Sequence, residues 1–93
     1  MSKHEYKTLI YALEGKYTHS LRYWWDNSGQ KAYGEKQRAR LVGGIPSQMK
    51  QLEQALTELD QDGWELVAYS TYMAFPWTLH GTAVLRRPLQ KGP

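Results

Sequence analysis

Aromatic rings and cations alternate in one stretch of the chain, a combination that binds anionic ligands bearing rings. Rings stack on bases and cations contact phosphate groups, so the pattern is typical of nucleotide-binding and single-strand-binding proteins. The candidate ligand-binding residues are Arg22, Trp24, Lys31, Arg38 and Arg40. A competing interpretation assigns the rings to the core, because aromatic residues favour strands and bury well.

These residues leave three candidate roles for the aromatic segment. A phosphorylated or nucleotide-like small molecule is one predicted ligand, held by a sequestering protein of the phage anti-defence type. Single-stranded nucleic acid is a weaker prediction, because the net charge is only +3 and acidic residues lie nearby. The third role is burial against a protein partner.

Residue patterns for catalysis or metal binding are missing from the sequence. The chain has no cysteine, which excludes disulfides, thiolate nucleophiles and zinc fingers. Its histidines, His4, His19 and His80, have no metal-ligand spacing. No phosphate-binding loop and no Gly-x-Ser-x-Gly elbow occurs. We therefore expect a protein that is not an enzyme and that carries no metal and no cofactor.

Length and composition indicate a single small globular domain over residues 1–93, with 41% apolar and 13% aromatic residues. No apolar run reaches the roughly 18 residues that a membrane span needs, and no secretory signal opens the chain. We expect a cytoplasmic protein. Six basic and two acidic residues give residues 16–40 a net +4, whereas one basic and five acidic residues give 47–65 a net −4.

Period-two patterns of apolar residues predict strands over 5–13, 17–26, 64–74 and 78–87, with a polar tail over 88–93. The first of these segments is apolar on both faces, which favours an interior strand. The pattern fades between 30 and 46, where we expect a mobile basic connection that includes at most a short strand over 30–33.

The spacing of apolar residues predicts a helix over 47–62. Its stripe consists of Met49, Leu52, Ala55, Leu56 and Leu59, with Gln, Glu and Lys on the other side. Ser47 after Pro46 is the expected N-cap. Gly63 is expected to end the helix in a left-handed conformation, with Trp64 contacting Leu59 in a Schellman motif.

Two short motifs resemble those of a known domain family. One is the block Asp62-Gly63-Trp64-Glu65-Leu66-Val67 after a Leu- and Glu-rich helix, and the other is the strand end Leu85-Arg86-Arg87-Pro88. With Glu5-Tyr6-Lys7 upstream, the chain resembles a small bacterial and phage domain family of unknown function. The likeness covers 4–13 and roughly 48–88, and residues 16–46 depart from it. The resemblance implies a strand followed by a helix and a hairpin, and it implies no activity.

The combined expectation is an α+β domain with the order β-β-α-β-β, in which three to five antiparallel strands carry one helix on one face. One helix covers only one face of such a sheet, and the other face would leave aromatic residues in water. A second copy of the chain is the expected cover, unless the 17–25 segment folds over that face. The leading predicted function is therefore a non-enzymatic module that forms homo-oligomers through the sheet.

Overall fold

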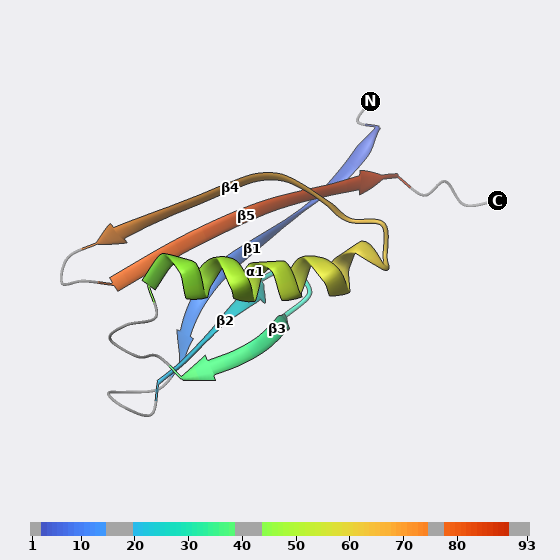
Figure 1. Ribbon diagram of the computed structural model, residues 1–93. Coiled ribbons are helices and arrows are strands. Elements are labelled where there is room, and N and C mark those ends of the chain that lie inside the picture. Colours follow the sequence, from blue (N-terminus) through green and yellow to red (C-terminus); the bar gives the residue numbers. More distant parts are fainter. Residues whose placement is uncertain (1–2, 15–19, 39–43, 75–77, 90–93) are drawn as a thin grey trace.

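The computed structural model describes residues 3–14, 20–38, 44–74 and 78–89, and these ranges form one α+β unit (Figure 1). The elements are β1 (His4–Glu14), β2 (Leu21–Asp26), β3 (Lys31–Arg38), α1 (Gly44–Asp60), β4 (Glu65–Ala74) and β5 (Thr78–Pro88). The predicted α+β class is confirmed. The predicted order β-β-α-β-β is wrong, because the helix follows three strands.

The strands form one antiparallel sheet in the order β3-β2-β1-β5-β4. β1 lies at its centre, as the two apolar faces of this segment predicted, and α1 crosses one side of the sheet (Figure 1). The segment 20–38 extends the sheet sideways through β2 and β3 and does not fold over it. Residues 15–19 and 39–43 lie outside the described part of the chain.

The prediction of a mobile connection over 30–46 is wrong for residues 31–38, which form β3. It runs over eight residues of a polar and basic sequence, KAYGEKQR, which has no apolar alternation. Such a sequence forms a strand because β2 supplies one row of backbone hydrogen bonds and α1 packs closely on it. At Gly34, with φ +75°, a Cβ atom would lie only 3.0 Å from the Gln51 carbonyl oxygen.

The helix begins earlier than expected and turns a different face to the sheet. It starts at Gly44, so Pro46 lies in the first turn, where its missing N–H costs nothing. Ser47 is therefore not the N-cap, and its hydroxyl lies 3.3 Å from Gln37 Oε1. The buried face includes Gln48 and Gln51, which we predicted to face solvent, whereas Met49 is 47% exposed.

The predicted end of the helix is confirmed in detail. Gly63 has φ +85°, and its amide donates to the Asp60 carbonyl at 3.0 Å. The Trp64 amide donates to the Leu59 carbonyl at 3.2 Å, which completes a Schellman motif. Leu59 and Trp64 both belong to the buried core. The cap therefore fixes the direction in which the chain enters β4.

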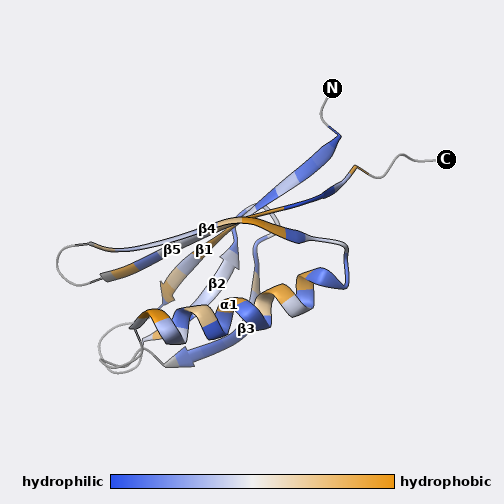
Figure 2. Cartoon of the chain, turned by 45° about the horizontal axis from the view of Figure 1, so that its top comes forward, coloured by the Kyte–Doolittle hydropathy of each residue, from blue (hydrophilic) through white to orange (hydrophobic). Residues whose placement is uncertain are grey.

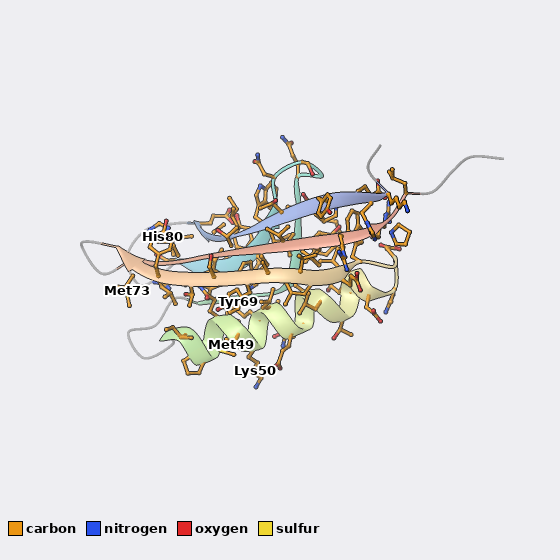
Figure 3. The ribbon with its side chains drawn as sticks, turned by 90° about the horizontal axis from the view of Figure 1, so that it is seen from above. Met49, Lys50, Tyr69, Met73 and His80 are labelled. Carbon is orange, nitrogen blue, oxygen red and sulfur yellow. The ribbon has the colours of Figure 1, made fainter. Side chains whose placement is uncertain are left out.

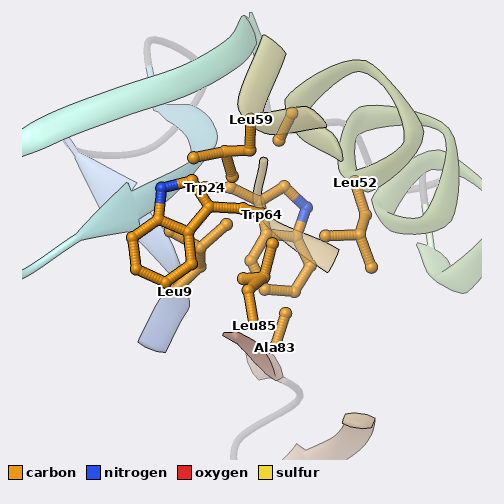
Figure 4. Close-up of a cluster of buried hydrophobic side chains, with 8 residues drawn as sticks. Leu9, Trp24, Leu52, Leu59, Trp64, Ala83 and Leu85 are labelled. Carbon is orange, nitrogen blue, oxygen red and sulfur yellow. The ribbon is translucent and has the colours of Figure 1, made fainter. Parts of the chain in front are cut away.

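The core lies between α1 and the sheet (Figure 4). It joins side chains from β1, β2, α1 and β5 with Trp64, the residue before β4. The members are Leu9, Trp24, Leu52, Ala55, Leu59, Trp64, Ala83 and Leu85. Trp24 is its largest fully buried side chain. Burial of an aromatic or leucine side chain contributes about 2 kcal/mol each, so this cluster is the main source of stability on the helix side.

Candidate functional site

Trp24, a predicted ligand-binding residue, lies in the core. Its side chain is 0% exposed, and its indole N–H donates to the Gln48 carbonyl at 3.2 Å. The ring contacts Tyr11 at 5.2 Å and Tyr69 at 6.0 Å between centroids. Because the indole is covered by α1, it presents no surface on which a base could stack, and the core interpretation of this ring applies.

The four predicted cations are not brought together around a common ligand. Arg22 pairs with Gln37 at one end of the β2–β3 ladder, whereas Lys31 pairs with Asp26 at the other end. Lys31 Nζ lies over the Tyr33 ring at 5.0 Å. Arg38 pairs with Leu21, its side chain lies outside the described part of the structure, and so does Arg40.

Arg22 has an unusual environment among these cations. Its Nε is buried without a hydrogen-bond partner, and its guanidinium carbon lies 6.0 Å from the centre of the Tyr11 ring. Burial raises the pKa of Tyr11 above its usual value, and the nearby Arg22 charge opposes that rise. In the described chain no carboxylate forms an ion pair with Arg22.

Two helix glutamines form a buried polar network that the sequence did not predict. The Tyr69 hydroxyl donates to Gln48 Oε1, and Gln48 Nε2 lies 3.3 Å from the His80 carbonyl oxygen. The Tyr11 hydroxyl donates to Gln51 Oε1 in the same way. Burial raises the pKa of Tyr69, so both hydroxyls stay protonated donors at neutral pH. Gln51 Nε2 also donates to the carbonyls of Arg22 and Glu35, so the network anchors α1 to all five strands.

Lys7 and Asp26 form a buried ion pair. Lys7 Nζ lies 2.5 Å from Asp26 Oδ2, and the Asp26 side chain is fully buried. Burial by itself raises the pKa of Asp26, but hydrogen bonds from Lys7, from the Gly29 amide and from Ser28 outweigh it, and the pKa is lowered. Lys7 also lies over the Trp64 ring at 5.0 Å. The pair is satisfied within the fold, so it serves as structure rather than as an acid–base site.

The side of the sheet opposite α1 is covered by no element of the described chain. We call it the open face and define it by Tyr6, Ile10, Tyr23, Trp25, Tyr72 and Val84, which the strand register places on that side. Tyr6 is 59% exposed, Tyr72 58% and Ile10 41%. Alternation along β1 explains this arrangement, because Leu9 points under the helix while Ile10 points away from it.

Rings on the open face are ordered by contacts among themselves and with cations. Tyr72 stacks on His80 at 4.9 Å with an interplanar angle of 10°, and Tyr23 meets Trp25 edge-on at 6.1 Å. Lys36 Nζ lies 4.5 Å above the Tyr23 ring. Figure 3 shows His80 on the far side of the sheet from Tyr69 and α1. These contacts hold the rings in place without covering them.

Two ion pairs border the open face. Lys36 Nζ lies 3.3 Å from Glu14 Oε2, and Arg86 Nε lies 2.7 Å from Glu65 Oε1. The second pair joins directly opposite residues of β4 and β5. In the described part of the chain, no group of three metal-ligating side chains is brought together.

Comparisons with family models, with curated proteins and with solved structures find no match to this chain. Within the described residues, none of the helical structure is long and apolar enough to cross a membrane.

Proposed function

We propose that this chain is a non-enzymatic interaction module that self-associates through the open face of its sheet. The observation that carries the proposal is the exposure of Tyr6, Ile10 and Tyr72 on a face over which the described chain places no element. Proteins that act as monomers rarely expose contiguous apolar patches of more than a few hundred Å². A second copy of the chain is the cover that the charges around this face favour.

The charges around the open face also suit a second copy. Glu14 is paired with Lys36, and Glu65 is paired with Arg86, so these border charges are neutralised within each chain. A two-fold interface places the same patch against itself, and an unpaired charge there would meet its own like charge. The side chains of Tyr23, Trp25 and Tyr72 in this patch carry no charge.

Light scattering coupled to gel filtration tests this proposal. We expect a mass above that of one chain, and the same mass in about 1 M NaCl, because apolar association is not screened by salt. Ile10→Lys places a charge at the centre of the open face and should lower the mass. Asn27→Lys, in the exposed β2–β3 turn, adds the same charge elsewhere and should leave the mass unchanged. A single-chain mass for the wild type would contradict the proposal.

A small anion held by Arg22 is a second candidate function, which the unpartnered Nε of that residue favours. Thermal unfolding with inorganic phosphate and with a nucleoside monophosphate tests it, because a ligand that binds only the folded state raises Tm. The candidate predicts a rise that is lost in Arg22→Gln. Equal Tm values with and without both anions would contradict it.

A further inference from the structure

The two edge strands of the sheet, β3 and β4, differ in how far their backbone groups are protected from pairing with another strand. At the β3 edge, side chains of α1 bond to the strand's backbone: Glu58 accepts from the Gly34 amide at 3.1 Å and Gln54 from the Glu35 amide at 3.3 Å. β3 is also hydrophilic over most of its length (Figure 2). Charged side chains and covered backbone groups are the usual protection of an edge strand against pairing.

The β4 edge lacks this protection. β4 is ten residues long, ELVAYSTYMA, and contains no proline, no lysine and one charged residue, Glu65, at its start. A bulge between Leu66 and Ala68 interrupts only its first part. Beyond its ladder with β5, no described segment forms a backbone hydrogen bond with β4. The stretch from Ala68 to Ala74 is therefore a regular strand with one free side.

Exposed apolar side chains lie along the same edge on the helix side. Met73 is 55% exposed and pairs with the buried Leu79, which places it on the side that α1 covers elsewhere. Met49 is 47% exposed and Ile45 is 44% exposed on the first turns of α1. Figure 3 shows Met49 and Met73 on the same side of the sheet as Tyr69, toward the start of the helix. We call Ile45, Met49 and Met73 the edge strip.

We propose that β4 pairs antiparallel with β4 of a second copy, which joins the two sheets into one and brings the two edge strips together. The pairing would centre on the regular stretch between Ala68 and Ala74. Two copies meet there without like-charge repulsion, because the only charged residue of β4 lies outside that stretch. A copy of the chain always offers the same strand, with the same length and alternation, and this is why it suits the edge better than an unrelated peptide.

This surface is separate from the open face, so the inference goes beyond the proposed function. An edge pairing and a face pairing are each two-fold, and together they close into an assembly of four chains when their two axes cross at a right angle. The axis of an antiparallel strand pair stands perpendicular to the sheet and the axis of a face pairing lies parallel to it, so this arrangement is the one we expect. The edge therefore determines whether the oligomer stops at two copies or continues to four.

Sedimentation equilibrium of single-surface variants separates the two interfaces. Met73→Lys removes an exposed apolar group of the edge strip and should halve the assembly from four chains to two. Ile10→Lys on the open face should also halve it, and the double variant should sediment as one chain. Asn27→Lys is the charge-matched control and should remain at four. Met49→Lys, on α1, replaces Met73→Lys if that variant does not fold.

Each result decides between the interfaces. If Ile10→Lys lowers the mass and neither Met73→Lys nor Met49→Lys does, the edge pairing is wrong and the proposed function survives. If only the edge-strip variants lower the mass, the edge pairing survives and the open face is not the interface. A wild type that sediments as one chain would overturn both.

Cysteine crosslinking tests the strand pairing itself. The chain has no native cysteine, so every disulfide that forms involves the introduced residue. In a two-fold antiparallel pair one residue faces its own copy, close enough for a disulfide. Single cysteines are introduced at each residue from Ala68 to Met73 in the Ile10→Lys background, so that crosslinks through the open face are suppressed. We expect a crosslinked dimer at one position in this stretch and none at Thr57→Cys on α1. No crosslink at any of the six positions would overturn the pairing.

Discussion

The Tyr69 hydroxyl donates a hydrogen bond to the side chain of Gln48, which ties β4 to α1 at the centre of the domain. Gln48 is fully buried and also lies within hydrogen-bonding distance of the His80 carbonyl on β5. One polar side chain in the helix thus satisfies groups on two strands. The open edge strand is held in place by this contact and by the β5 ladder.

Removing either partner should destabilise the domain by different amounts. Tyr69→Phe deletes one donor and should cost about 1 kcal/mol. Gln48→Leu should cost about 2 kcal/mol, because it leaves the buried Tyr69 hydroxyl without its acceptor, whereas the His80 carbonyl keeps its bond from the Thr71 hydroxyl. Urea unfolding at a fixed protein concentration measures both. The double variant should be less destabilised than the sum of the two single variants. Simple additivity would show that the two groups do not interact.

Gly81 is expected to tolerate no side chain. A Cβ at this position would lie 2.7 Å from Gln48 Nε2 and 2.9 Å from Trp24 Cη2, so Gly81→Ala should cost about 1–3 kcal/mol through overpacking. Gly63→Ala is the matched comparison. It meets no atom within 4 Å, and its cost of about 1 kcal/mol arises from the φ of +85°.

Asparagine distinguishes the two causes, because it adopts left-handed backbone more readily than alanine. Gly63→Asn should be more stable than Gly63→Ala in thermal unfolding. At Gly81 the order should be reversed, because the larger side chain clashes more. The same order at both positions would contradict these assignments.

The Lys7–Asp26 pair should make stability fall in acid. The pKa of Asp26 is lowered in the folded state, so its stabilising contribution is fully present above the ordinary aspartate value of about 3.9 and is lost as the pH falls through the folded value. Asp26→Asn should cost about 2–4 kcal/mol at neutral pH, because Lys7 is left largely buried without its partner.

Urea unfolding of the wild type and of Asp26→Asn at a series of pH values checks this assignment. The difference in unfolding free energy between them should be constant from pH 7 to about 5 and should shrink below about 3.9. A difference that does not change with pH would mean that the Asp26 charge is not the source of the stabilisation.

Local signals in the sequence predicted the parts of the fold that depend on few residues. The Gly63 stop and the Trp64 contact follow from backbone chemistry within one turn, and the two apolar faces of the β1 segment predicted its central position. The open face was predicted from the same count of apolar faces. The family resemblance stays a prediction.

The remaining features depend on partners that are distant in the sequence. Gln48 and Gln51 are buried because tyrosine hydroxyls on β4 and β1 need acceptors beneath the helix. In the sequence, the one sign of this burial is that the two glutamines are three residues apart and adjoin the apolar stripe. β3 has no apolar pattern because an edge strand under a helix is held by hydrogen bonds rather than by burial. The predicted ligand-binding residues do not come together either, because strand pairing decides their positions. The β2–β3 ladder places Arg22 and Lys31 at opposite ends.

Oxidative footprinting of the open face tests the central claim most directly. In an isolated chain Tyr6 and Tyr72 are 59% and 58% exposed, and Leu13, at 51% on the opposite face of β1, is an internal reference. We predict that the ratio of Tyr6 and Tyr72 oxidation to Leu13 oxidation is low in the concentrated wild type and rises in Ile10→Lys or on dilution. Equally rapid oxidation of Tyr6 and Tyr72 in the concentrated wild type and in Ile10→Lys would show that nothing covers this face.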